Sequence, residues 1–97
     1  MQLYSTKNKQ LRVSLKEAVM KGLPEDNGLY MPLEIPKLSQ SFIEGLKKYS
    51  FQEIAFEISA TLFGSSVPIE KLKEIIKRAI SFPAPVVRLD EYKYVLE

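Results

Sequence analysis

The chain has 97 residues, 45% of them hydrophobic and 27% charged, which is typical of one folded domain. It contains neither cysteine nor histidine, which excludes disulfides, cysteine nucleophiles and the usual zinc ligands. With 14 Lys and Arg against 12 Asp and Glu, the net charge is +2, which is too small to indicate nucleic-acid binding by itself.

The same composition limits the chemistry and the setting of the protein. Without histidine, acid–base catalysis would have to use a carboxylate, a lysine or a tyrosine. No apolar run approaches the length of a membrane span, and the first ten residues lack the apolar core of a signal peptide. We therefore expect a cytoplasmic protein with no membrane partner and no nucleic-acid partner.

The first quarter of the chain predicts two short strands followed by a helix. Residues 2–5 and 11–13 are the strands, on either side of a polar loop. Ser14 and Glu17 form a capping box, in which each side chain bonds the backbone N–H of the other residue, so a helix begins there. Gly22 ends it.

The next segment predicts a turn, a strand and a weak helix. Residues 24–28 form the turn, because Asn27 readily adopts a positive φ before glycine. Residues 28–31 are short and apolar and predict a strand. A helix follows from residue 38, and Gly45 inside it costs about 1 kcal/mol relative to alanine.

Residues 51–63 form the most hydrophobic helical segment of the chain. Ser50 and Glu53 make a second capping box, and Gly64 is expected to close the helix in the left-handed conformation. Its apolar residues lie on two faces, one made of Phe51, Ile54, Ala55, Ile58 and Leu62 and the other of Phe56, Ala60 and Phe63. A helix with two apolar faces predicts that the rest of the chain wraps around it.

The last third predicts one amphipathic helix and a hairpin. Pro68 suits the first position of a helix over residues 69–80. Pro83 and Pro85 then force an extended path into two strands, residues 86–89 and 92–96. The whole pattern predicts a single small α+β domain, residues 1–97, with about four helices and a few short β-strands including a C-terminal hairpin. Because the last strand reaches the final residue, we expect a piece of a longer chain.

Few residues suggest chemistry. Glu17 and Glu53 are explained by helix capping, and no catalytic or metal-binding set can be assembled. A basic loop is the one candidate for anion binding: it combines three cations and an amide, Lys7, Asn8, Lys9 and Arg12. These residues are suited to clamp a phosphate, and the alternative is an ordinary solvated basic loop.

Several separated stretches occur in the order found in one enzyme family. They are Tyr4-Ser5-Thr6-Lys7-Asn8, Val13-Ser14-Leu15 with Ala18-Val19 and Gly22-Leu23, Asp26 through Pro32, Ser50 through Glu57, Phe82 through Val86, and Tyr94-Val95-Leu96-Glu97. Together they resemble the N-terminal domain of threonine synthases over essentially the whole chain. The departures are Lys7, where the family often has arginine, and Asn27, where it often has glycine.

The resemblance implies a function for a longer parent protein. Threonine synthases are lyases that use pyridoxal phosphate to convert O-phosphohomoserine and water into threonine and phosphate. The family's cofactor-binding lysine lies in a segment after the last residue of this sequence. The resemblance therefore implies no catalytic residue, no cofactor-binding residue and no cofactor in this fragment, with pyridoxal phosphate in the full-length parent. It implies that the partners are the catalytic domains of the same full-length chain, and that O-phosphohomoserine is the parent's substrate.

The family's opening motifs also suggest which residues lie near the substrate. The substrate-proximal candidates are Ser5, Thr6, Lys7, Asn8, Gly28, Leu29 and Tyr30. Two other functions remain open from the sequence. One is a stand-alone interaction module that docks a partner through the face made of Phe56, Ala60 and Phe63. The other is a small nucleic-acid-binding domain that uses the basic loops.

Overall fold

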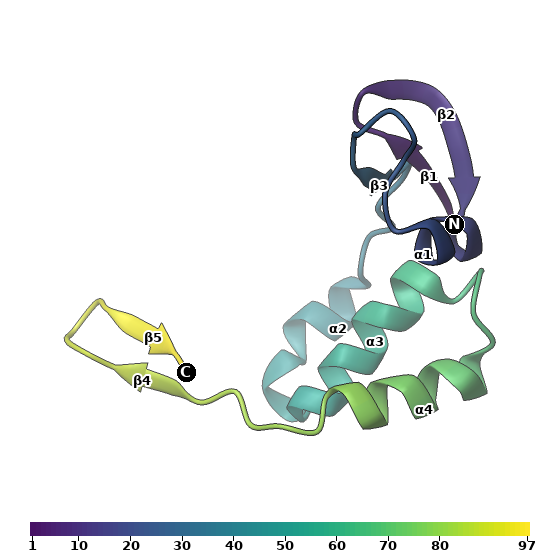
Figure 1. The fold of residues 1–97 in the computed structure, drawn as a ribbon. Helices are drawn as coiled ribbons and strands as arrows, with labels where there is room; N and C mark the ends of the chain where they lie inside the picture. Colours follow the sequence, from purple (N-terminus) through teal and green to yellow (C-terminus); the bar gives the residue numbers. More distant parts are fainter.

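The computed structural model describes residues 1–97 and shows three parts that follow one another along the chain (Figure 1). The first part contains β1 (Gln2–Ser5), β2 (Asn8–Ser14), α1 (Leu15–Lys21) and β3 (Tyr30–Pro32). The second contains α2 (Gln40–Glu44), the 3-10 helix η1 (Leu46–Lys48), α3 (Phe51–Phe63) and α4 (Ile69–Ala79). The third is a hairpin of β4 (Val86–Arg88) and β5 (Tyr94–Leu96). The predicted α+β class, four helices and C-terminal hairpin are confirmed.

The first part is a three-stranded antiparallel sheet with β1 in the middle, in the order β2-β1-β3. The pairing places Ser5 opposite Tyr30 of β3 and opposite Asn8 of β2. Strand β2 begins three residues earlier than predicted, so the expected loop over residues 6–10 is only the turn of Thr6 and Lys7. The reason is that β1 supplies a pairing partner for this polar stretch, which the hydrophobic pattern of β2 alone does not reveal.

Both predicted capping boxes are present. The Ser14 hydroxyl accepts from Glu17 N–H at 3.2 Å, and the Ser14 N–H donates to the Glu17 carboxylate at 3.4 Å. Ser50 and Glu53 repeat the same pair of bonds at the start of α3, again at 3.2 and 3.4 Å. Each box gives a hydrogen-bond acceptor to two backbone N–H groups, those of the serine and of the glutamate, which a helix start would otherwise leave unpaired.

Two predictions about helix ends were wrong. Gly64 has φ −61° and ψ −23°, so α3 ends in the right-handed conformation and continues into a turn, with Val67 N–H bonded to Phe63 O at 2.8 Å. The helix predicted from residue 38 is broken at Gly45, which separates α2 from η1. The low helix propensity of glycine accounts for this break.

The buried interior is small. Only seven of the 97 residues are buried, and the apolar ones among them are Leu3, Ala18, Phe42 and Leu72. Helix α4 contacts α3 and buries its Leu72, yet no residue of α3 itself is fully buried. The prediction that the chain wraps around α3 was therefore wrong, because the sheet, the helices and the hairpin lie side by side instead of stacking on one core (Figure 1).

The hairpin stands apart from the other two parts at the end of an extended linker (Figure 1). The linker contains Pro83 and Pro85, as predicted, and runs from the end of α4 to β4. None of the helices is long and apolar enough to cross a lipid bilayer.

Candidate functional site

The most completely bonded polar cluster lies where β1 meets the turn before β3. The Ser5 side chain is fully buried, and its hydroxyl donates to the Asp26 carboxylate at 2.7 Å from Oδ1 and 2.8 Å from Oδ2. Asp26 Oδ1 also accepts from the Gly28 N–H at 2.9 Å. The Ser5 oxygen accepts from the Lys7 N–H at 3.3 Å. One carboxylate and one hydroxyl thus connect two turns that are 21 residues apart.

A second pair of hydrogen bonds locks the same two turns together. Thr6 N–H donates to Leu29 O, and Leu29 N–H donates to the Thr6 hydroxyl oxygen, both at 2.9 Å. Asn27 has a positive φ of 65°, as the Asn-Gly pair predicts, and it turns Gly28 toward Ser5. We call Ser5, Thr6, Asp26, Gly28 and Leu29 the turn cluster.

Gly28 is required in the turn cluster for space. A Cβ atom at this position would lie 2.5 Å from Ser5 Oγ and 3.0 Å from both Asp26 Oδ1 and Thr6 Oγ1. Contacts this short are not compatible with a side chain, so the backbone can approach Ser5 only if residue 28 is glycine.

The turn cluster keeps Asp26 ionised. The hydrogen bond from Ser5, followed by the Gly28 N–H, lowers the pKa of Asp26 below its ordinary value of 3.8, and the charge of Lys7 acts in the same direction. Because both carboxylate oxygens already hold the turn, Asp26 is suited to positioning and not to proton transfer. Nearby, an exposed ion pair joins Lys21 to Glu25 at 2.7 Å, and its hydrogen bond raises the pKa of Lys21 and lowers that of Glu25.

The structure brings the predicted substrate-proximal stretches together. Residues 5–8 and 28–30 meet at the turn cluster, with Ser5 paired to Tyr30 across the sheet. Lys7 is exposed at the tip of its turn, and Asn8 begins β2, where its side chain accepts from Gln10 N–H at 3.0 Å. The Tyr30 hydroxyl is buried without a hydrogen-bond partner.

Two sequence interpretations of this region need revision. The four residues of the expected phosphate clamp do not share a loop, because Lys9 and Arg12 belong to β2 and Arg12 pairs with Tyr4 in the sheet. The role of Asp26 was missed, since it was interpreted only as a turn residue. Its spacing to Ser5 follows no local motif, so no sequence signal links the two.

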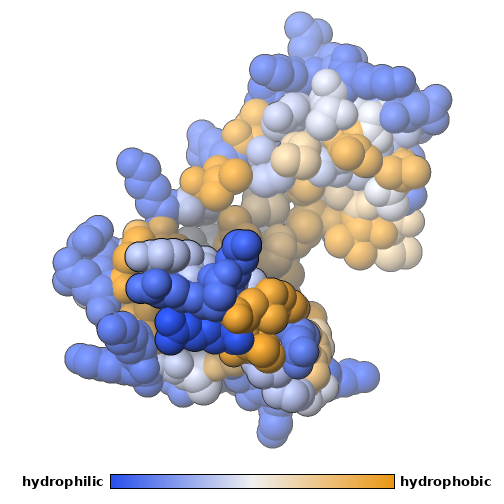
Figure 2. All heavy atoms as spheres, turned by 90° about the vertical axis from the view of Figure 1, so that its left-hand side faces the viewer, coloured by the Kyte–Doolittle hydropathy of each residue, from blue (hydrophilic) through white to orange (hydrophobic).

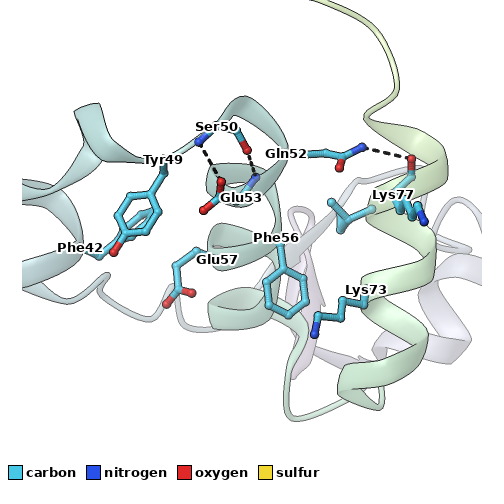
Figure 3. A pocket seen from close by; sticks show the side chains of 10 residues that line it. Phe42, Tyr49, Ser50, Gln52, Glu53, Phe56, Glu57, Lys73 and Lys77 are labelled. Carbon is cyan, nitrogen blue, oxygen red and sulfur yellow. Dashed lines mark hydrogen bonds between the residues drawn. The ribbon is translucent and has the colours of Figure 1, made fainter.

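A groove lies between α3 and α4 and is bordered on a third side by Phe42 of α2 and by Tyr49 (Figure 3). Its volume is about 550 Å³, and its lining residues are Phe42, Tyr49, Ser50, Gln52, Glu53, Phe56, Glu57, Lys73, Ile76 and Lys77. The Lys73 ammonium is 6.0 Å from the centre of the Phe56 ring. The Gln52 amide donates to Lys77 O at 3.3 Å and to Ile80 O at 2.8 Å, which ties the start of α3 to the end of α4.

The groove does not suit a phosphorylated cofactor that needs a lysine. Every lysine of the chain is exposed, whereas a lysine that reacts as a neutral amine is held in a desolvated pocket. The two lysines of the groove, Lys73 and Lys77, share it with the carboxylates Glu53 and Glu57, which would repel a phosphate. The residues present therefore do not fit pyridoxal phosphate. No group of three or more carboxylates is placed to hold a metal ion.

The second apolar face of α3 is not an open surface. Phe56, Ala60 and Phe63 are all partly covered within the chain. Phe56 borders the groove, where the aliphatic stem of Lys73 crosses toward it (Figure 3). The most exposed large apolar side chains lie elsewhere, on α1, at Ile35 in the loop after β3, and on the β4–β5 hairpin.

These features define a class of protein: a small α+β unit in which the hydrogen bonds of Ser5, Asp26 and Gly28 fix a turn. A sequence model of the threonine synthase N terminus matches residues 2–80. The chain therefore belongs to the threonine synthase N-terminal family, and the resemblance inferred from the motifs is confirmed.

Curated relatives are threonine synthases that are much longer than this chain. The Escherichia coli enzyme is 33% identical over 90 residues, which is 93% of this chain and 21% of that protein. The Schizosaccharomyces pombe enzyme is 42% identical over 78 residues, which is 79% of this chain and 15% of that protein. This chain thus spans only 21% and 15% of the length of these two relatives, and it matches their N-terminal part.

Solved structures give the same picture. The crystal structure of Escherichia coli threonine synthase superposes with a TM-score of 0.90 at 33% identity, covering 100% of this chain and 23% of that one. A pyridoxal-phosphate-bound threonine synthase from Brucella melitensis superposes with a TM-score of 0.87 at 27% identity, covering 100% and 22%. The observed fold is therefore the fold of the N-terminal region of threonine synthases.

Proposed function

We propose that this chain is the non-catalytic N-terminal domain of a threonine synthase. In full length, such an enzyme converts O-phosphohomoserine and water into threonine and phosphate, with pyridoxal phosphate supplying the carbanion chemistry. The observation that carries the proposal is the whole-chain superposition on about a quarter of the Escherichia coli enzyme. The proposed partners are the catalytic domains of the same full-length chain, and the proposed setting is the cytoplasm.

The part this domain plays is to shape one wall of the substrate cleft. The turn cluster holds the Thr6-Lys7 turn through hydrogen bonds, and Lys7 in that turn is exposed. Lys7 and Asn8 are the residues that reach the substrate phosphate in this proposal, while Ser5, Gly28, Leu29 and Tyr30 position them. A lysine contacts phosphate as a point charge, without the two-pronged geometry of arginine.

Two measurements test the proposal. The isolated chain is titrated with pyridoxal phosphate, and we expect no change from the absorbance of free cofactor and no phosphate release from O-phosphohomoserine. A chimera is then made in which residues 1–97 replace the matching 23% of Escherichia coli threonine synthase. We expect this chimera to release phosphate from O-phosphohomoserine.

The controls separate the two halves of the proposal. Stoichiometric cofactor binding by the isolated chain would show that it carries a catalytic site of its own. A folded chimera that binds cofactor but lacks activity would contradict its assignment as a threonine synthase domain. The Escherichia coli enzyme with the same N-terminal region deleted serves as the baseline for activity without this domain.

A further inference from the structure

The chain exposes far more surface than a compact protein of its mass. Its accessible surface is 7890 Å², whereas a compact monomer of 11.1 kDa exposes about 5700 Å². Its radius of gyration is 16.6 Å, against about 13 Å for a compact domain of this length. The excess of roughly 2200 Å² exceeds the roughly 800 Å² that each partner buries in a standard interface.

The β4–β5 hairpin exposes several large apolar side chains. Val86 pairs with Leu96, and Arg88 pairs with Tyr94, so these four side chains share one face of the two-stranded sheet. On that face Val86, Tyr94 and Leu96 are 63%, 58% and 70% exposed. We call these three residues the hairpin face. On the opposite face, Val87 and Val95 are 37% and 40% exposed.

Nothing in the first 80 residues covers the hairpin face. The hairpin lies at the end of the linker that contains Pro83 and Pro85, away from the sheet and the helices (Figure 1). Figure 2 looks onto this side and shows apolar groups on the near, lower part and on the upper part, with a hollow between them. A two-stranded hairpin without a third strand or a packed face is marginally stable in water, so its native state has a partner.

The family comparison locates that partner. The threonine synthase N-terminal model ends at residue 80, where α4 ends, so the hairpin lies outside the family unit. The Escherichia coli crystal structure nevertheless covers 100% of this chain, hairpin included, within a chain that is more than four times longer. The hairpin is therefore part of the common fold and belongs with the region that follows residue 80.

We infer that the hairpin face docks on the catalytic region of the full-length threonine synthase, and that the N-terminal unit proper ends at Phe82, whose ring packs on Phe51 of α3. This inference rests on the proposed function. It divides the segment that the sequence predicts as one domain, residues 1–97, into a folded unit, a linker and a docking hairpin. The partner is an apolar surface of the same polypeptide, and the free outer edges of β4 and β5 offer it backbone hydrogen bonds as well.

The first test removes the hairpin from the isolated chain. Truncation after Pro83 keeps Phe82, whose ring centre lies 6.0 Å from that of Phe51 in α3. It should leave the thermal unfolding midpoint within about 2 °C of that of residues 1–97, because the hairpin itself contributes nothing to the interior of the preceding residues. Amides of β4 and β5 should exchange with solvent at nearly the rate of an unfolded chain. Loss of folding in the truncated chain, or a clearly lower midpoint, overturns the inference.

The second test uses the chimera with Escherichia coli threonine synthase. In it, we expect the hairpin amides to exchange at least about 100-fold more slowly than in the isolated chain. The double variant Val86→Ser, Leu96→Ser should lose that protection. Ile75→Ser, which changes an aliphatic residue of α4 that is 52% exposed, is the matched control and should keep it.

Other occupants of the hairpin face give distinct results. Protection in the isolated chain that does not depend on concentration would mean that the hairpin packs on its own first 80 residues. Protection that rises with concentration, together with a doubled mass, would mean that a second copy is the partner. Either result overturns the inference. An active chimera with unprotected hairpin amides refutes the docking alone, and a protected hairpin in an inactive chimera refutes the proposed function alone.

Discussion

The Ser5 hydroxyl donates a hydrogen bond to the Asp26 carboxylate across a distance of 2.7 Å, and it does so from a fully buried position. This bond joins the end of β1 to the turn that precedes β3. It makes the conformation of the Thr6-Lys7 turn dependent on residues that lie 20 positions further along the chain.

Replacing Gly28 by alanine should destabilise the fold by about 1–3 kcal/mol, the usual cost of overpacking. The new methyl group would stand 2.5 Å from Ser5 Oγ, so the cost is steric. Urea unfolding measures it. The Ser5→Ala background removes that oxygen, and the two changes should therefore be non-additive.

Gly22→Ala is the matched control, because Gly22 has a φ of 79° and nothing within 4 Å of the added atom. Its cost, about 1–2 kcal/mol, arises from the left-handed backbone alone. It should add to the cost of Ser5→Ala without coupling. Additive behaviour of Gly28→Ala with Ser5→Ala would contradict the steric explanation.

The stability of the chain should depend on the ionisation of Asp26. Its pKa is lower in the folded state than its ordinary value of 3.8, so the folded state favours the carboxylate. The contribution is fully present above that ordinary value, and it disappears as the pH falls through the lower folded value. We expect the thermal midpoint to fall more steeply below about pH 4 than that of Asp26→Asn.

The comparison with Asp26→Asn distinguishes this group from the other carboxylates, which titrate in both proteins. Parallel midpoint curves for the two proteins would show that Asp26 is not held by Ser5 and Gly28 in solution. Ser5→Ala should flatten the acid-dependent difference, because it removes the largest cause of the lowered pKa.

Replacing Ser50 by alanine should cost about 1 kcal/mol of stability, because the Glu53 N–H loses its hydrogen-bond acceptor. Ser14→Ala should cost a similar amount, since its geometry at Glu17 is the same. Urea unfolding of both variants checks this. Ser50→Asp should retain most of the stability because aspartate also caps, and a loss equal to that of alanine would argue against capping.

Replacing Lys7 by alanine in the active chimera should raise KM for O-phosphohomoserine with little change in kcat, because the lysine contributes binding charge and no chemistry. Steady-state phosphate release measures both constants. Lys9→Ala is the matched control, because Lys9 is also exposed but lies in β2. Equal kinetics for the two variants and the parent would remove Lys7 from the substrate site.

The local elements could be predicted because their signals are local. The capping boxes at Ser14 and Ser50, the glycine end of α1 and the turn at Asn27 each depend on residues within four positions of one another. Hydrophobic spacing likewise located α3 and α4. The conformation of Gly64 at the end of α3 could not be predicted in this way, because the residues that follow it continue into a turn bonded to Phe63.

The candidate site could be predicted only in part. The family motifs selected residues 5–8 and 28–30, and the sheet places these stretches together. Asp26, which connects them, carried no signal, because a hydrogen bond across 21 residues leaves no pattern in the intervening sequence. The prediction of a phosphate clamp on one loop was wrong for a related reason. Lys9 and Arg12 are positioned by the pairing of β2 with β1, which the composition of the segment does not reveal.

The sequence by itself determined which segments are helices and strands, and through its ordered motifs it determined the family. These properties depend on contacts between near neighbours and on residue identity. Only the tertiary structure decided that α3 stays half-covered, that Ser5 and Asp26 meet, and that the hairpin stands apart from the sheet and the helices. These outcomes depend on how much apolar surface each part can bury against the others, which is a property of the assembled chain.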